Sequence, residues 1–110
     1  MASTPDRAPF VTPLAAELAD DVLARFLRYA VIDTQSDSDS TTYPSSENQL
    51  DLSRLLVGEL HELGIDDARL TEHGYVFATL PGTVATPVVG LLAHVDTAPG
   101  TPGKRRSKLR

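Results

Sequence analysis

The sequence feature that most constrains the fold is an uncharged, mostly aliphatic run of eight residues, Val88 to Val95. Pro87 and Pro99 bound this part of the chain. Its length and composition are typical of a strand that other elements cover on both faces. A buried helix is the alternative, but Pro87, Gly90 and the shortness of the run favour the strand. We therefore expect a buried strand here.

Two polar residues lie at the end of this run, His94 and Asp96. In an extended chain, residues two apart point to the same face, so the imidazole and the carboxylate would emerge side by side. A histidine that binds a metal commonly donates its second ring N–H to such a carboxylate, which fixes the tautomer and aims the ring. The alternative is a hydrogen-bonded histidine at a strand end, with Asp96 beginning an Asx turn toward Pro99. The residues alone leave both interpretations open, and the second is the commoner one.

Composition narrows the class of protein and the chemistry available. The chain has 110 residues, 41% of them hydrophobic and 23% charged, which fits a single globular domain. Because it contains no cysteine, a metal site must use His, Asp or Glu. The first 13 residues contain no apolar segment of the kind found in secretory signals, and the eight-residue run is far shorter than the ~20 residues that span a bilayer. We expect a cytoplasmic protein that does not contact membranes.

Charge is distributed unevenly along the chain. Residues 1–103 carry five basic and fifteen acidic side chains, whereas five basic residues fall between Lys104 and Arg110. We therefore expect a flexible leader over residues 1–13, a domain over residues 14–99 and a separate basic tail over residues 100–110. The tail suggests an alternative function, a small noncatalytic module that binds nucleic acid or an acidic partner. The acidic domain before it would repel nucleic acid, so we do not expect a nucleic-acid partner.

Two helices are predicted in the first two thirds of the chain. The first begins at Pro13 with Thr12 as its N-cap, and its charged face, which includes Arg25 and Arg28, is expected to be solvated. Asp21 can pair with Arg25 on that face. Its apolar side chains recur every four residues: Leu14, Leu18, Val22, Phe26 and Ala30.

A polar loop, residues 33–47, leads to the second helix, for which Ser46 and Gln49 suggest a capping box and Gly64 an end. His61 is expected on its surface. A hairpin follows, with strands over residues 68–72 and 75–80 joined by a turn at His73 and Gly74. The turn already accounts for His73, so we do not count it as a metal ligand.

Four stretches of the chain together resemble one known family. They are residues 25–36 (RFLRYAVIDTQS), 44–49 (PSSENQ), 73–81 (HGYVFATLP) and 93–99 (AHVDTAP). They resemble the peptidase T family, tripeptide aminopeptidases among the dinuclear zinc exopeptidases. The resemblance covers about residues 18–99. It implies an α/β fold, specifically the incomplete N-terminal part of a zinc-exopeptidase catalytic domain with helices packed on a mixed sheet and without the lid domain.

The resemblance also implies roles for the two polar residues. His94 matches the first zinc ligand of the family, and Asp96 matches the active-site aspartate that orients this histidine. The implied reaction releases the N-terminal residue of a tripeptide at two zinc ions. The family's other ligands and its glutamate base lie beyond the last matching stretch, where eleven unmatched residues follow. We therefore expect a fragmentary gene product with no activity of its own, with apolar surface exposed beside the strand and with low stability.

Overall fold

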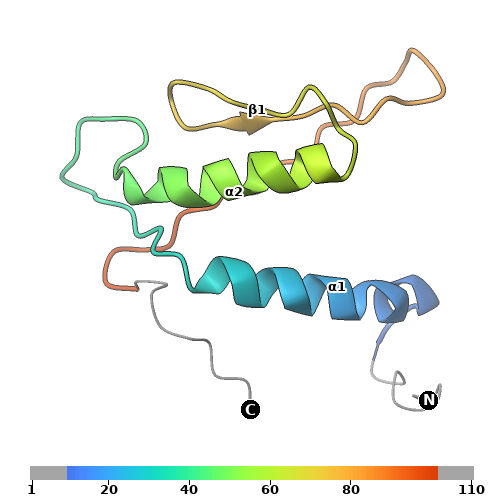
Figure 1. Ribbon diagram of the computed structural model, residues 1–110, viewed down its shortest axis with the longest axis horizontal. Coiled ribbons are helices and arrows are strands. Elements are labelled where there is room, and N and C mark those ends of the chain that lie inside the picture. Colours follow the sequence, from blue (N-terminus) through green and yellow to red (C-terminus); the bar gives the residue numbers. More distant parts are fainter. Residues whose placement is uncertain (1–9, 102–110) are drawn as a thin grey trace.

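A computed structural model describes residues 10–101 of the chain, and within them two helices and a two-stranded sheet form. Helix α1 spans Pro13–Ala30 and helix α2 spans Asn48–Glu62. Strands β1 (Arg69–Leu70) and β2 (Val76–Phe77) pair antiparallel and pack on α2, on the side opposite α1 in Figure 1. These elements are compatible with part of an α/β domain. The basic run 104–110 and most of the expected leader lie outside the described residues.

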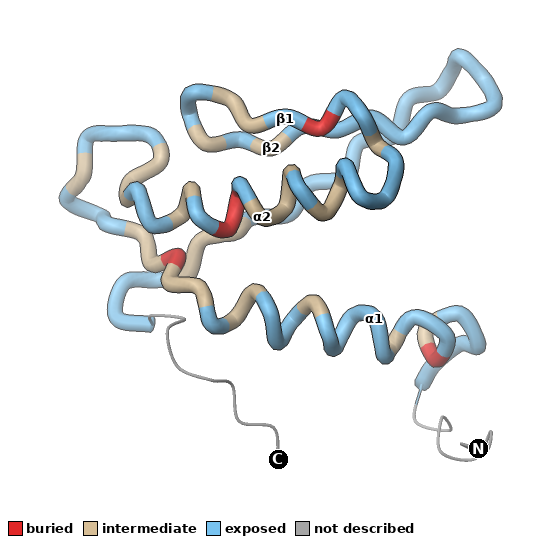
Figure 2. The backbone as a smooth tube through the Cα atoms, viewed as in Figure 1, coloured by how far each residue is buried: buried red, intermediate tan, exposed pale blue. Residues whose placement is uncertain are grey.

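Helix α1 begins as the sequence predicts. The Thr12 side chain accepts a hydrogen bond from the Ala15 N–H at 3.0 Å, and Pro13 occupies the first helical position, where no N–H is needed. The large apolar side chains of this helix are 37–61% exposed, because no described layer covers them, whereas the small Ala16 near its start is buried (Figure 2). Neither described helix is long and apolar enough to cross a membrane.

Helix α2 ends as predicted but does not begin as predicted. Gly64 has φ +88°, its N–H donates to His61 O at 2.9 Å, and the Ile65 N–H donates to Leu60 O at 3.0 Å, which is a Schellman ending. The predicted capping box of Ser46 and Gln49 is wrong, because the N-cap residue is Glu47 and its side chain makes no capping hydrogen bond. The Ser46 hydroxyl, which was expected to cap the helix, instead donates to Gln35 O at 2.7 Å and so binds the preceding loop.

The hairpin is confirmed with shorter strands than predicted. Arg69 pairs with Phe77, and the turn places Gly74 at φ +84°. Ser53 on α2 is nearly inaccessible to solvent, and its hydroxyl lies 3.4 Å from Gly74 O, so the turn packs against the helix. The small core lies here, with Leu52 and Ala68 as its buried apolar residues.

The prediction of a buried strand over residues 88–95 is wrong. This segment forms neither a helix nor a strand and has no strand partner among the described residues, and its bulky side chains at 88, 89, 91 and 92 are 78–96% exposed. The composition of these residues is typical of a covered strand. The neighbouring strands and helices that would cover such a strand are not present among the described residues. The expectation of exposed apolar surface beside this segment is confirmed.

Candidate metal-binding site

The residues just after His94 are held by the loop that follows α1. The Thr97 N–H donates to Thr34 O at 3.0 Å, and the Ser36 N–H donates to Thr97 O at 2.8 Å. Together these bonds form a parallel bridge between Gln35 and Thr97. In Figure 1 the last of the described residues, in red, pass beside the start of this loop. Backbone hydrogen bonds thus fix the chain one residue beyond Asp96.

Side chains reinforce this bridge. The Ser36 hydroxyl donates to Thr97 O at 3.1 Å, and the Gly100 N–H donates to Gln35 Oε1 at 2.8 Å. Thr34 is buried beneath the contact. In the sequence these residues look only like part of a polar loop. Their partner lies 61 positions away, so no local pattern reports it.

His94 and Asp96 lie side by side, as the spacing of two residues in an extended chain requires. His94 Nδ1 is 2.9 Å from Asp96 Oδ1. Because an ionised carboxylate only accepts hydrogen bonds, this contact in a neutral imidazole favours the tautomer with the proton on Nδ1 and the lone pair on Nε2. The His94 side chain is 86% exposed and that of Asp96 40%, so Nε2 is open to a ligand. The Asp96 carboxylate therefore holds the histidine ring, and no Asx turn is recorded in this part of the structure.

The other two histidines of the chain lie elsewhere and have other contacts. His61 Nε2 is 2.8 Å from Ala68 O, which links α2 to the start of the hairpin. His73 lies in the hairpin turn, 3.8 Å from a Glu72 carboxylate oxygen. Between residues 10 and 101, no three His, Cys, Asp or Glu side chains are grouped closely enough to hold a metal ion. The donor chemistry of His94 and Asp96 therefore fits one ligand position of a metal site.

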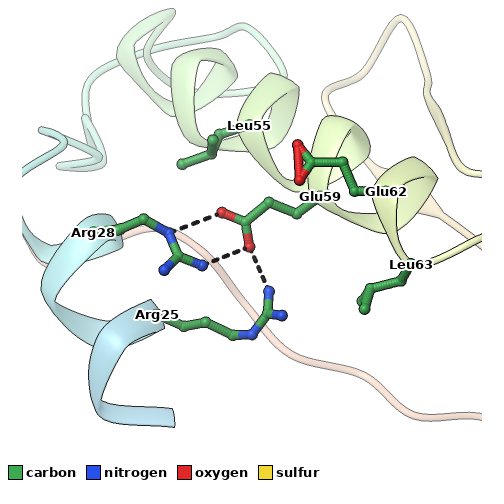
Figure 3. A pocket seen from close by; sticks show the side chains of 6 residues that line it. All are labelled: Arg25, Arg28, Leu55, Glu59, Glu62 and Leu63. Atoms are coloured by element: carbon green, nitrogen blue, oxygen red, sulfur yellow. Dashed lines mark hydrogen bonds and ion pairs between the residues drawn. The ribbon is translucent and has the colours of Figure 1, made fainter. Parts of the chain in front are cut away.

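A second polar cluster joins the two helices and was not foreseen. Glu59 on α2 accepts hydrogen bonds from Arg28 at 3.1 and 3.2 Å, from Tyr29 at 2.7 Å and from Arg25 at 2.5 Å. Figure 3 shows both carboxylate oxygens facing the two arginines across an open groove, which is also lined by Leu55, Glu62 and Leu63. The Glu59 side chain is only 12% exposed. The Arg25 side chain is 28% exposed and that of Arg28 is 47% exposed, so the sequence-based expectation of a solvated charged face is wrong for Arg25 but holds for Arg28.

The same cluster shifts the ionisation of Glu59. Hydrogen bonds from Arg28 and Tyr29 favour the charged carboxylate and hold the pKa of Glu59 below its usual range. The predicted pair within α1 is also present, with Arg25 Nε 2.8 Å from Asp21 Oδ2. The bonds of Glu59 to Arg25, Arg28 and Tyr29 thus join α2 to α1, and none of them involves His94 or Asp96.

The chain was compared with protein-family models and with curated proteins. No family model matches it. Curated relatives named peptidase T do match: 56% identity over 84 residues with the protein of Desulfitobacterium hafniense, 47% over 88 with that of Alkaliphilus oremlandii, and 44% over 89 with that of Listeria welshimeri. These matches cover 74%, 76% and 79% of this chain but only 20%, 22% and 22% of the relatives.

The chain thus spans about a fifth of the length of the curated relatives it matches. The matches run over more than eighty residues, whereas the four short stretches singled out in the sequence total 34 residues, so the similarity extends well beyond those stretches. The resemblance of this chain to the peptidase T family is therefore confirmed over about three quarters of its length.

Proposed function

We propose that this chain contributes the first metal ligand, His94, to a zinc-dependent aminopeptidase of the peptidase T type. Such an enzyme would release the N-terminal residue of tripeptides in the cytoplasm. The observation that carries the proposal is the 2.9 Å contact between His94 Nδ1 and Asp96 Oδ1 on a ring that is otherwise open to solvent. The relatives named peptidase T give the reaction class.

Each residue of this end of the chain has a defined task in that proposal. Asp96 accepts the Nδ1 proton, which keeps Nε2 unprotonated and restricts rotation of the ring. The hydrogen bonds that Thr97 donates to Thr34 O and accepts from the Ser36 N–H fix the backbone next to Asp96, so the pair is presented in one orientation. Two zinc ions, when bound, would polarise the scissile carbonyl and activate a water molecule.

The same reasoning leads us to propose that the 110-residue chain has no peptidase activity of its own. A catalytic zinc site takes about three protein ligands, and His94 with its orienting carboxylate offers one. In the complete family site the matched residues would form one part of the catalytic α/β domain. The alternative function, binding through the basic tail, concerns residues outside the described part of the chain and stays a prediction.

Histidine-ring NMR during a zinc titration of the full chain tests the ligand assignment. Before zinc is added, His94 should show the tautomer protonated at Nδ1, and Asp96→Asn should weaken that preference. Zinc should then perturb His94 Nε2 at lower concentration than either ring nitrogen of His73, which serves as the matched exposed control. Equal perturbation of both rings, or a zinc response that survives His94→Ala, would contradict the assignment.

A peptidase assay tests the second part of the proposal. Tripeptide is incubated with the purified chain and zinc, and release of the N-terminal residue is followed. We expect none above the level of the His94→Ala variant. Metal-dependent cleavage by the wild-type chain, absent from that variant, would show that the chain holds a complete site.

A further inference from the structure

The pair formed by His94 and Asp96 is held from one side only. Among the described residues, no backbone group from residue 82 to residue 95 takes part in a recorded hydrogen bond. The His94 side chain is itself 86% exposed, so packing does not hold the ring either. A restraint on the orientation of the ring therefore has to come through Asp96 and the residues that follow it.

The residues after Asp96 form a turn that is closed on itself. The Thr101 N–H donates to Ala98 O at 3.1 Å, and the Thr97 hydroxyl donates to Thr101 O at 2.8 Å. Gly100 takes φ +88° within this turn, a conformation that glycine adopts without strain. The position of the turn relative to Asp96 then depends on how the turn is attached to the loop after α1.

Two anchors attach the turn to that loop. The first is the backbone bridge between Gln35 and Thr97. The second lies three residues further on, where the Gly100 N–H donates to the side-chain carbonyl oxygen Oε1 of Gln35 at 2.8 Å. A single bridge would let the turn pivot about Thr97, whereas two anchors hold it in one orientation. The side chain of Gln35 thus supplies the second anchor.

The Gln35 side chain is itself held in place. Its Nε2 donates to Asp33 Oδ1 at 3.4 Å, and its backbone N–H donates to the same oxygen at 3.2 Å. The Gln35 C=O accepts the bond from the Ser46 hydroxyl, just before α2. Because a carboxylate only accepts hydrogen bonds, Asp33 selects the amide orientation in which Nε2 faces it and Oε1 faces Gly100.

We propose that Gln35 is a positioning residue for the His94 ring. Its side chain holds the turn at Gly100, and this keeps the Asp96 carboxylate where it can accept the Nδ1 proton of His94. Gln35 has no recorded bond to His94 or Asp96, so it acts through the turn. This inference rests on the proposed function, because it concerns the orientation of the same ligand.

Ring nitrogen NMR of the full 110-residue chain, without metal, tests the positioning role. Gln35→Met keeps the length of the side chain and removes the acceptor for Gly100. The fraction of His94 protonated at Nδ1 should then fall toward that of His73, the exposed reference in the same chain. Exchange of the Thr97 amide should quicken by ~10-fold. Gln35→Glu keeps an acceptor oxygen and should restore most of the Nδ1 preference.

A second variant and a matched control address the same anchor. A Cβ on Gly100 would meet nothing within 4 Å, so Gly100→Ala acts only through its unfavourable positive φ and should also lower the Nδ1 fraction of His94. Gln49→Met is the control, because Gln49 Nε2 donates to the hydroxyls of Ser45 and Ser46 at 3.0 and 3.2 Å and has no recorded bond to the turn. It should leave the ring unchanged.

A zinc titration of the same variants separates this inference from the ligand assignment. If both hold, Gln35→Met should raise the zinc concentration for half of the His94 response by roughly 10-fold. If zinc perturbs His94 and His73 equally in the wild-type chain, the ligand assignment fails, while a lowered Nδ1 fraction in Gln35→Met still supports the positioning role. The positioning role is overturned if Gln35→Met keeps the wild-type Nδ1 fraction, if Gln49→Met lowers it as much, or if Gln35→Glu restores none of it.

Discussion

Replacement of Gly74 by alanine tests how closely the hairpin packs on the chain before α2. Gly74 has φ +84°, a conformation that costs a residue with a Cβ roughly 1–2 kcal/mol. A Cβ at this position would also lie 3.0 Å from Pro44 Cδ and 3.3 Å from Leu50 Cδ2. Such overpacking typically costs ~1–3 kcal/mol. Gly74→Ala should therefore destabilise the hairpin by about 2–5 kcal/mol.

Gly64 provides the matched control for this substitution. It has nearly the same φ, +88°, but a Cβ there would meet nothing within 4 Å, so Gly64→Ala should cost only roughly 1–2 kcal/mol. Hydrogen exchange of the Thr71 amide, which donates to Tyr75 O across the hairpin, provides the assay. Exchange should be ~10-fold or more faster in Gly74→Ala than in Gly64→Ala. Equal rates would refute the close approach to Pro44.

Two further predictions concern the packing around α2. Leu52 is 6% exposed and is the largest buried apolar residue of the described core. Leu52→Ala should therefore lower the free energy of unfolding by about 2–5 kcal/mol. Leu63 is 61% exposed, so Leu63→Ala should change the free energy of unfolding by less than ~0.5 kcal/mol. Urea titrations followed by circular dichroism measure both, and similar losses would contradict the placement of the core. Because the pKa of Glu59 is lowered in the folded chain, its bonds to α1 stabilise the fold at neutral pH, and this contribution is lost as the pH falls through that lowered pKa. Glu59→Gln should remove this part of the acid dependence, and an unchanged acid titration would contradict the role of the cluster.

Local signals in the sequence were sufficient where one short stretch determines the structure. Thr12 with Pro13 fixes the start of α1, and Gly64 fixes the end of α2, because capping and positive φ depend on a few neighbouring residues. Gly74 likewise fixes the hairpin turn. The spacing of His94 and Asp96 was enough to place their side chains together, because side-chain direction alternates along any extended chain.

Contacts between distant residues could not be predicted in this way. Ser46 has the residue type and spacing of a cap, yet its hydroxyl bonds to Gln35. Arg25 and Arg28 lie on a face that looks solvated until Glu59, more than thirty positions away, comes into contact. The buried strand expected at residues 88–95 is not formed in the described structure, because strand pairing and burial depend on partners that a local pattern does not contain.

A chimeric enzyme tests the central claim most directly. The matching fifth of the Desulfitobacterium hafniense peptidase T is replaced by the matching residues of this chain, and tripeptide hydrolysis and bound zinc are measured on the purified protein. If His94 is a metal ligand oriented by Asp96, the chimera should hydrolyse tripeptides, His94→Ala should lose zinc and activity, and His73→Ala should keep both. Full zinc content and activity in the His94→Ala chimera would contradict the account.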